Sequence, residues 1–536
     1  MAVELAEPVM DLAILFIIIG GFLLISNKLS LPSIPIFILA GIIAGFFIEQ
    51  ENIFELARWG VAFLVFAFGV SVDFKEIKTV LWESEYAVSI QILIIGSLCI
   101  IIGLMLGFDN INALYFAAAV ILSSTMVGFK LAGHAGKSRL VRGRLSETIQ
   151  FTDDILAVFL ILFLGSVSIR GLSPIPILRN LVIGIILLVI AMLIYNYGFE
   201  YIVSLAGGSE ELSLMSSISL LIVFLSISEY FGISIAVGAF IAGLAVKIEP
   251  VSSTELLNGI ESIKYFFSAI FFAMLGGLLT IPGLQTVLIS LVLVLLVVFI
   301  KPLFTILILL WEGFDIRTSA LTGFRLNQMS EFTLIIAIEG FLLGIIILEL
   351  FDAIILAVVV TMIISSITIR KEEQIFDKIF KRMNVDYPAK RIDDKSAVQT
   401  GLKNHIIIIG YGRQGKKLVD ICRSKDLDFL VIEDDPVKLE DLEDECENYV
   451  FGDAMHDYTW EKASINNAKV VISTIDKDIV SKKLLEMDID RPVVPKAHTM
   501  EKTREYFEKG AFYVNNPNIL VYRFLEEKVN EEVVQD

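Results

Sequence analysis

FTDDILAVFLILFLG, at residues 151–165, places Asp153 and Asp154 side by side in an apolar stretch that is long enough to span a bilayer. No basic residue inside the stretch neutralises them. A charged side chain near the bilayer centre costs at least about 2.5 to 3.5 kcal/mol, so such residues line a water-filled cavity and carry a function. The alternative is a pair at a helix end among lipid headgroups. Arg144 lies well before the pair and uncharged residues follow it, which favours an intramembrane site and predicts ion transport.

The composition is that of a polytopic membrane protein. Of the 536 residues, 56% are hydrophobic, and the mean hydropathy is +0.76. The net charge of −18, without a basic stripe of interleaved aromatic residues, argues against nucleic-acid binding. The acidic N-terminus lacks the basic region of a signal peptide, so we expect the first apolar segment to be retained as a helix. From Arg370 onward, charge runs predict a soluble domain.

Thirteen apolar segments are candidate transmembrane helices, and they begin near residues 9, 32, 54, 86, 111, 145, 175, 212, 232, 262, 284, 317 and 347. With the N-terminus outside, the basic loop at 130–144 falls inside and the acidic loop at 49–55 falls outside. The odd number of spans then places the C-terminal domain in the cytoplasm. The sequence thus predicts an integral plasma-membrane protein, embedded in lipid, with three parts: a transmembrane domain at 1–370, a linker at 371–402 and a cytoplasmic domain at 403–536.

Polar residues interrupt two of these segments. They lie at 123–125 in the fifth segment and at 327–331 in the twelfth. Non-helical backbone at membrane depth is tolerated where it lines a cavity, and transporters often place one broken helix in each of two inverted repeats. For the first interruption, hydroxyls bonded back to their own helix are the alternative. Lys301 stands between two apolar runs, so we expect it to be the countercharge of Asp153 or Asp154 unless it snorkels from a helix end.

These motifs together resemble the second family of the monovalent cation:proton antiporter superfamily, which holds the Kef-type potassium efflux systems and the NapA-type sodium/proton antiporters. The resemblance covers nearly the whole chain and rests on FLVFAFGVSVDFKEI at 63–77, SSTMVGFKL at 123–131, GRLSETIQFTDDILAV at 143–158, SISEYFGISIAVGAFIAGLAV at 226–246, FFAMLGGLL at 271–279, Lys301 and MSEFTLIIA at 329–337. It implies an NhaA/NapA-like fold of thirteen transmembrane helices with inverted repeats, in which segments five and twelve are crossed broken helices. It also implies a homodimer whose subunits each have a moving core.

The acidic motif bears on the transported ion. Kef-type members resemble QD at this position, whereas Asp153 and Asp154 are similar to the DD of electrogenic sodium/proton antiporters. The resemblance therefore implies Na+/H+ exchange, in which the cation and protons compete for a site of Asp153, Asp154 and Lys301; K+/H+ exchange of the Kef type is the alternative. Asp154 is expected to be the main ion ligand and proton carrier, with Asp153 as its electrostatic partner. The further oxygen ligands expected for Na+ or K+ are Ser124, Thr125, backbone carbonyls and, in an orienting role, Glu331.

The C-terminal domain begins with a dinucleotide-binding fingerprint, HIIIIGYGRQGKKLVDICRSKDLDFLVIEDDP at 405–436. The pattern predicts a buried strand, a glycine-rich turn, a helix, and a second strand that ends in acids close to a ribose. The domain resembles the α/β Rossmann fold of the RCK N-lobe, or TrkA-N, regulatory domain, with NYVFGDAMH at 448–456 matching its GDA segment. The expected nucleotide-binding residues are Gly410, Gly412, Arg413, Gln414, Gly415, Glu433, Asp434, Gly452, Asp453 and Ala454.

The acid at the end of the second strand favours an unphosphorylated ribose, hence AMP, ATP or NAD(H) rather than NADP(H) as the regulatory ligand. A degenerate Rossmann fold that serves only in dimerisation is the alternative. A dehydrogenase is disfavoured because no substrate domain follows the fingerprint. An RCK-gated potassium channel is disfavoured because the GYG at 410–412 belongs to the Rossmann turn and not to a filter loop. The chain lacks the P-loop pattern of a primary pump, so we expect a secondary transporter and not an enzyme.

Overall fold

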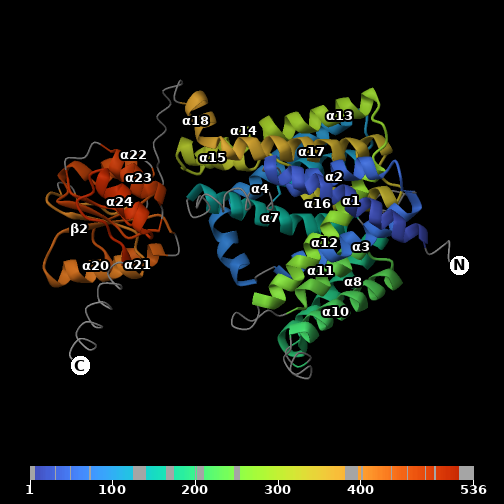
Figure 1. The fold of residues 1–536 in the computed structure, drawn as a ribbon, viewed down its shortest axis with the longest axis horizontal. Helices are drawn as coiled ribbons and strands as arrows, with labels where there is room; N and C mark the ends of the chain where they lie inside the picture. The colour runs from blue at the N-terminus through green and yellow to red at the C-terminus, as the bar shows by residue number, and fades with distance from the viewer. Residues whose placement is uncertain are drawn as a thin grey trace. The chain divides into compact units, whose positions relative to one another are not determined.

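The structure, a computed structural model, describes residues 6–29, 32–48, 50–71, 74–124, 141–164, 174–199, 201, 210–246, 254–380, 396–399, 402–435, 438–455, 457–476, 478–487 and 491–517. The chain divides into two compact units (Figure 1). The first comprises residues 1–131, 145–308 and 319–383, and the second comprises residues 132–144, 309–318 and 384–536.

The described residues from 6 to 380 fold into helices, as the apolar segments predict, and short parts of three of these helices, at 141–144, 309–311 and 316–318, are assigned to the second unit. The helices are α1 (Ala6–Leu29), α2 (Ser33–Ala44), α3 (Gln50–Ser71), α4 (Phe74–Met105), α5 (Asn110–Ile121), α7 (Val141–Leu164), α8 (Pro174–Leu193), η2 (Ile194–Gly198), α10 (Glu210–Phe231), α11 (Ile235–Leu244), α12 (Thr254–Leu278), α13 (Leu284–Leu295), η3 (Leu296–Ile300), α14 (Lys301–Trp311), α15 (Ile316–Arg325), α16 (Glu331–Leu342), α17 (Leu348–Arg370) and α18 (Glu372–Phe380). Within the described ranges, five helices are long and apolar enough to cross a membrane by length and composition. The count of thirteen spans and the inverted repeats stay predictions.

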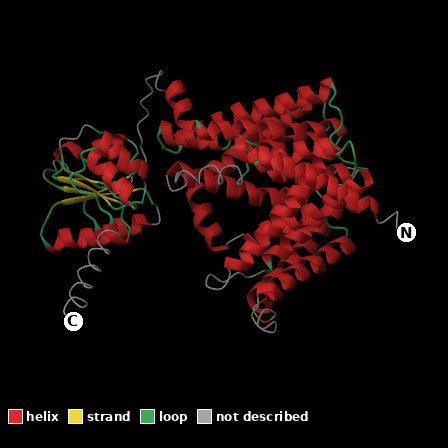
Figure 2. Ribbon diagram, viewed as in Figure 1, coloured by secondary structure: helices red, strands yellow, loops and turns green. Residues whose placement is uncertain are grey.

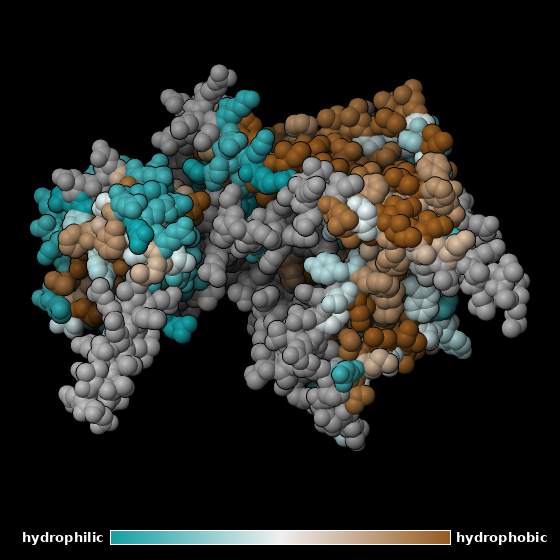
Figure 3. All heavy atoms as spheres, viewed as in Figure 1, coloured by the Kyte–Doolittle hydropathy of each residue, from teal (hydrophilic) through white to brown (hydrophobic). Residues whose placement is uncertain are grey.

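The outer surface of the helical unit is apolar. Figure 3 shows hydrophobic side chains spread over its visible face, in contrast to the hydrophilic surface of the second unit. Exposed residues include Leu284, Leu288 and Leu291 on α13 and Ile185 and Val189 on α8. An apolar surface of this extent is unfavourable in water and favourable against lipid tails.

Helices α2 and α12 pack with their backbones nearly in contact. A Cβ atom at Gly41 of α2 would lie 1.7 Å from the carbonyl oxygen of Ala273, and one at Gly276 of α12 would lie 2.0 Å from that of Ile38. Small residues permit such close approach between membrane helices, where van der Waals packing rather than hydrophobic burial drives association. These glycines therefore fix α2 against α12.

Both predicted helix interruptions begin where the sequence places them. Helix α5 ends at Ile121, and Leu122 continues in extended backbone with φ −73° and ψ 135°. Residues 125–140, which include the predicted ligand Thr125, lie outside the described residues. Between α15 and α16 the chain is non-helical from residue 326 to 330, and Ser330 caps α16 by accepting a hydrogen bond from the N–H of Phe332.

Lys301 lies at a wide turn inside a long helix. The π-helical turn η3 ends directly before it, and the N–H of Lys301 bonds to the carbonyl of Leu296. Pro302 follows and has no N–H, so a regular α-helical hydrogen bond is missing at this point. Single π-turns often mark functional positions in helices.

The second unit contains a five-stranded parallel sheet in the order β3-β2-β1-β4-β5. Helices cover both of its faces (Figure 2). Its elements are β1 (Ile406–Ile409), α20 (Arg413–Ser424), β2 (Phe429–Glu433), α21 (Leu439–Glu445), β3 (Tyr449–Phe451), α22 (Asp457–Lys462), η5 (Ile465–Asn467), β4 (Val470–Ser473), α23 (Asp478–Glu486), β5 (Val493–Val494) and α24 (Met500–Glu508). The strand order reverses beside β1, which is where doubly wound sheets bind ligands at the carboxyl ends of their strands.

Candidate functional site

Asp153 and Asp154 lie on α7 in the interior of the helical unit. Each residue is 1% exposed. The backbone N–H of Ser123, in the extended segment after α5, donates to Oδ2 of Asp153 at 3.1 Å. An interrupted helix leaves N–H groups without helical partners, and Asp153 uses one of them. The first interruption thus lies directly against the acidic pair.

Lys301, at the start of α14, is fully buried and contacts the end of α5 directly before the first interruption. Its Nζ donates to the carbonyl oxygens of Val120 at 3.0 Å and Ile121 at 2.5 Å, which belong to the last turn of α5. These carbonyls lack helical partners, and the negative end of the helix dipole favours a cation there. The positive charge of Lys301 also acts on Asp153. Lys301, the predicted countercharge of the acidic pair, therefore makes its hydrogen bonds to two backbone carbonyls. Backbone carbonyls were also among the ion ligands expected from the sequence.

The second interruption is hydrogen-bonded to the first. The hydroxyl of Ser124 donates to Oε2 of Glu331 at 2.6 Å, and Nε2 of Gln328 donates to the carbonyl oxygen of Ser124 at 3.0 Å. Ser365 on α17 in turn donates to Oε1 of Gln328 at 2.7 Å. All four residues are at most 5% exposed. The segment at 123–124 and the segment at 328–331, far apart in the chain, therefore meet at one buried polar centre.

This centre supplies oxygen atoms for a cation. Asp153 Oδ1 and Asn327 Oδ1 are buried and have no hydrogen-bond partner among the described residues. Carboxylate, amide and hydroxyl oxygens are the donors that hard cations take from proteins. Of the predicted ligands, the structure brings together Ser124, Asp153, Lys301 and Glu331, and places Asp154 beside Asp153 on α7. The donor set fits Na+ or K+, both of which are hard monovalent cations.

Sequence reasoning did not single out Gln328, nor the buried ion pair between Arg325 and Glu372. Arg325 ends α15, directly before the second interruption, and its Nε and Nη2 donate to the two carboxylate oxygens of Glu372 at 2.9 and 3.1 Å. Glu372 begins α18, inside the predicted linker at 371–402. Both residues are at most 1% exposed. The charge-rich segment that contains Glu372 gives no sign of a buried partner 47 residues away. For Gln328 a signal was available, because it lies among polar residues inside an apolar segment.

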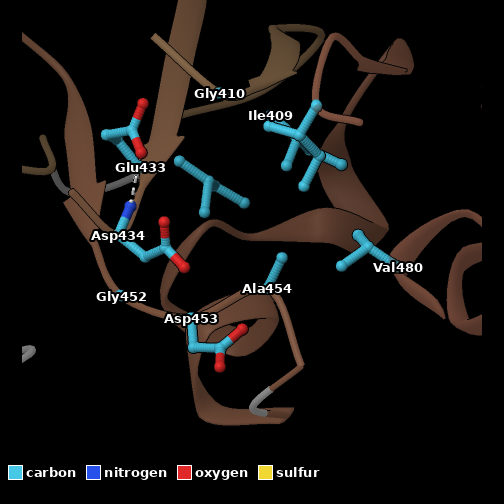
Figure 4. Close-up of a pocket in the computed structure, with 10 residues that line it drawn as sticks. Ile409, Gly410, Glu433, Asp434, Gly452, Asp453, Ala454 and Val480 are labelled. Atoms are coloured by element: carbon cyan, nitrogen blue, oxygen red, sulfur yellow. Dashed lines mark hydrogen bonds between the residues drawn. The ribbon is translucent and has the colours of Figure 1, made fainter. Parts of the chain in front are cut away.

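The predicted nucleotide site forms a pocket at the carboxyl ends of β1, β2 and β3 (Figure 4). It is lined by Ile409, Gly410, Ile432, Glu433, Asp434, Gly452, Asp453, Ala454, Ile475 and Val480. Six of the ten predicted binding residues line it. The other four, Gly412, Arg413, Gln414 and Gly415, lie at the start of α20, beside the glycine-rich turn. The pocket combines apolar side chains for a base with carboxylates for hydroxyl groups.

The three glycines of the fingerprint have three different environments. Gly410 has a φ of +94°, which other residues rarely adopt. A Cβ at Gly415 would lie 1.9 Å from the carbonyl oxygen of Gly410, so the helix packs against the turn only with glycine there. A Cβ at Gly412 would meet open space. These environments match a tight turn, a close helix contact and an open approach for a pyrophosphate.

Glu433 is surrounded by hydrogen-bond donors. It is 4% exposed. Its Oε2 accepts from the N–H of Tyr411 at 2.6 Å and from Nζ of Lys438 at 2.9 Å. Its Oε1 accepts from the N–H groups of Asp434 at 2.9 Å and Asp435 at 3.1 Å. Four hydrogen bonds therefore hold the carboxylate in one orientation at the end of β2.

Comparisons with known proteins agree with both units. The model of the family "Sodium/hydrogen exchanger, transmembrane" matches residues 13–371, and that of the TrkA-N domain matches residues 406–517. YbaL of Escherichia coli (strain K12) is 23% identical over 92% of this chain and 93% of its own length. The glutathione-regulated potassium-efflux system protein KefC of Enterobacter sp. (strain 638) is 24% identical over 86% of this chain and 74% of its own length.

The fold of the membrane unit also has a solved counterpart. The sodium proton antiporter MjNhaP1 from Methanocaldococcus jannaschii aligns with a TM-score of 0.54 at 15% sequence identity, over 70% of this chain and 99% of that protein. The family match confirms the resemblance to Kef-type antiporters with a C-terminal RCK domain. The chain belongs to the sodium/hydrogen exchanger family of membrane cation/proton antiporters, which are transporters, and it carries a TrkA-N domain of Rossmann type.

Proposed function

We propose that the protein exchanges Na+ for protons at the buried centre formed by Asp153, Asp154 and Lys301, and that a nucleotide bound to its TrkA-N domain regulates this exchange. The observation that carries the proposal is the contact of the first helix interruption with the acidic pair, together with the hydrogen bonds that join the second interruption to the first. Ser123 donates to Asp153, and Lys301 donates to the carbonyls that end α5. Half-helix ends that face buried charges are the arrangement by which transporters bind ions at membrane depth.

Charge balance accounts for the coupling. Two ionised carboxylates and one ammonium leave the centre with an excess negative charge, which a buried site keeps only with a compensating cation. A bound Na+ provides that charge, and when Na+ is absent the group holds protons instead. One Na+ displaces more than one proton, so the exchange moves net charge across the membrane. Because Na+ and protons neutralise the same groups, the binding of one displaces the other. In this scheme Asp154 is the main ion ligand, and Asp153 is its electrostatic partner, which also interacts with the positive charge of Lys301.

Glu331 and Gln328 position the first interruption. Their hydrogen bonds to the side chain and the carbonyl of Ser124 hold that residue on the second interruption. A change in either contact would shift Ser124 and also the neighbouring N–H group of Ser123, from which Asp153 accepts a hydrogen bond. Glu331 therefore acts through Ser124 rather than as a direct ligand of the ion.

Potassium is the second candidate cation. The acidic pair favours Na+, since it is similar to the DD of sodium/proton antiporters. The similarity to KefC, which extends over both the membrane unit and the TrkA-N domain, favours K+. The chemistry of the site is the same for both ions, because each takes oxygen ligands.

Proton flux across the membrane of proteoliposomes, followed with a pH-sensitive dye inside, tests the proposal. Na+ added outside should drive proton movement that depends on membrane potential, and Asp154→Asn should abolish it. Glu229→Gln is a matched control, because Glu229 is exposed and pairs with Arg58 at 3.5 Å. Electroneutral flux driven by K+ but not by Na+ would assign the protein to the second candidate. Full activity of Asp154→Asn would remove the central claim.

The assembly and orientation follow from the same proposal. The protein would be a homodimer in the plasma membrane, with its N-terminus outside and the TrkA-N domain in the cytoplasm. The domain boundaries are those expected from the sequence, at 1–370, 371–402 and 403–536. The regulatory ligand would be AMP, ATP or NAD(H), because an acid at the end of β2 suits an unphosphorylated ribose. Labelling of single cysteines placed at residue 2 and residue 530 with an impermeant reagent checks the orientation.

A further inference from the structure

The carboxylate of Glu433 has no acceptor position left for a ligand. An ionised carboxylate offers about four lone-pair positions, two on each oxygen. Three of its donors are the backbone N–H groups of Tyr411, Asp434 and Asp435, and the fourth is the ammonium group of Lys438. A ribose that binds Glu433 through its hydroxyl groups must therefore displace a donor that is already present.

Of these four donors, Lys438 is the one that can leave. The N–H of Tyr411 is fixed by the glycine-rich turn after β1, and those of Asp434 and Asp435 directly follow β2. Lys438 is a flexible side chain that is 31% exposed, and its Nζ lies 3.4 Å from Oδ2 of Asp435. A displaced ammonium thus keeps a carboxylate partner and gains contact with water.

Lys438 remains charged in the neutral range. Partial burial lowers its pKa, but the hydrogen bond to Glu433 and the charges of Glu433 and Asp435 outweigh this effect and hold the pKa above its ordinary value. The contact with Glu433 is therefore a charge-assisted hydrogen bond, which is stronger than one between neutral groups.

We propose that Lys438 is a built-in competitor for the ribose hydroxyl groups, so that a nucleotide binds the TrkA-N domain only by displacing the Lys438 ammonium from Glu433. Lys438 thereby lowers the affinity for every nucleotide with a free ribose diol and sets the concentration range over which the domain responds. This inference rests on the proposed nucleotide binding and adds the residue that limits it.

Calorimetry with the full-length protein in detergent tests the competition. AMP and NADH are titrated into the wild type and into Lys438→Met, which keeps the length of the side chain and removes its charge. We expect about tenfold tighter binding to the variant, the change that corresponds to the loss of one competing charge-assisted hydrogen bond. Lys509→Met is the matched control, because Lys509 pairs with Glu505 on α24 at 3.0 Å. Its affinity should equal that of the wild type.

A second ligand separates competition from a general effect of charge. 2′,3′-Dideoxy-AMP keeps the base and the phosphate but lacks both ribose hydroxyls, so its affinity should not rise in Lys438→Met. The competitor role would be overturned if the wild type binds AMP and Lys438→Met binds it no more tightly. It would also be overturned if the affinity for the dideoxy compound rises as much as that for AMP. Either result would leave nucleotide regulation standing. If neither protein binds AMP or NADH, both the competitor role and the proposal that AMP or NAD(H) is the regulatory ligand fail, because removal of the competing ammonium did not create a site.

Discussion

The two candidate sites use the same charged groups in opposite surroundings. In the membrane unit, Lys301 is fully buried and donates to backbone carbonyls at the end of α5. In the TrkA-N unit, Lys438 is 31% exposed and donates to Glu433 at the end of β2. Water can replace the partners of Lys438 but not those of Lys301. The charge of Lys301 is therefore indispensable to its neighbours, whereas the charge of Lys438 is exchangeable, which suits the proposed displacement of Lys438 by a nucleotide.

The largest effect should come from Lys301→Met. Removal of the ammonium leaves the last carbonyls of α5 and the carboxylate of Asp153 without their buried partner. Breaking a buried charged pair costs about 3 to 5 kcal/mol, so we expect a lower thermal midpoint in detergent together with loss of ion exchange in proteoliposomes. Lys264→Met, at a half-buried position on α12, is the control. Unchanged stability and exchange would mean that Lys301 only reaches toward the membrane surface and that the contrast between the two sites is wrong.

The ion pair between Arg325 and Glu372 should show nearly the same sensitivity. Arg325→Met or Glu372→Leu alone leaves one buried charge without its partner, with an expected cost of about 3 kcal/mol. The double variant Arg325→Met/Glu372→Leu removes both charges and should recover most of this loss, because apolar replacements of a buried pair are often neutral. Thermal unfolding of the wild type and the three variants gives the coupling energy. Additive losses would contradict a direct interaction.

Glycine substitutions should separate folding from binding in the TrkA-N unit. Gly415→Val forces a side chain against the carbonyl of Gly410 and should destabilise this unit by about 1 to 3 kcal/mol. Gly412→Val meets open space in the structure and should leave stability nearly unchanged, yet abolish nucleotide binding by filling the approach of the pyrophosphate. Both variants are measured by calorimetry and by thermal unfolding, and each variant serves as the control for the other. Undiminished nucleotide affinity in Gly412→Val would disprove the phosphate role of the turn.

The smallest effect concerns the half-exposed Asp476. Burial raises its pKa, but Lys496 at 2.6 Å and His498 at 2.8 Å outweigh this and lower it below the usual value. A carboxyl group with a lowered folded-state pKa stabilises the protein fully above its unfolded-state pKa of about 4 and loses this contribution as the pH falls through the folded-state value. Asp476→Asn should therefore destabilise the unit above pH 4, and the difference from the wild type should shrink in stronger acid.

Hydrogen exchange of the β4 peptide, measured for wild type and Asp476→Asn at the same pH, checks this prediction. Comparison at equal pH cancels the intrinsic pH dependence of the exchange rate. Because Asp476 is half-exposed, water and salt screen its ion pairs. We therefore expect only a modest difference in exchange rate between the wild type and Asp476→Asn. A difference that grows as the pH falls below 4 would contradict the sign of the effect.

Much of the architecture could be predicted from local patterns. Apolar segments of membrane length indicated the helices, and polar residues at 123–125 and 327–331 indicated the two interruptions. The strand, glycine-rich turn and acids of residues 405–436 indicated the start of the Rossmann fold, and the structure places Glu433 and the GDA segment in one pocket. These features depend on hydropathy, missing backbone hydrogen bonds and glycine conformations, which neighbouring residues determine.

The roles of individual partners could not be predicted in this way. Lys301 was expected to pair with the acidic residues, but its hydrogen bonds go to two backbone carbonyls, which carry no sequence signal. The contacts between Gln328 and Ser124, and between Arg325 and Glu372, join residues that are 204 and 47 positions apart. The saturation of Glu433 depends on three backbone groups whose directions follow from the ends of β1 and β2.

The sequence by itself determined that this protein has a membrane unit with a buried acidic pair and a Rossmann unit with a glycine-rich turn. It did so because the cost of burying charges in lipid and the conformational demands of glycine act locally along the chain. The tertiary structure alone decided which group neutralises which charge. Electrostatic and hydrogen-bond partners are chosen by distance in space, and helix packing brings together residues that no local pattern relates.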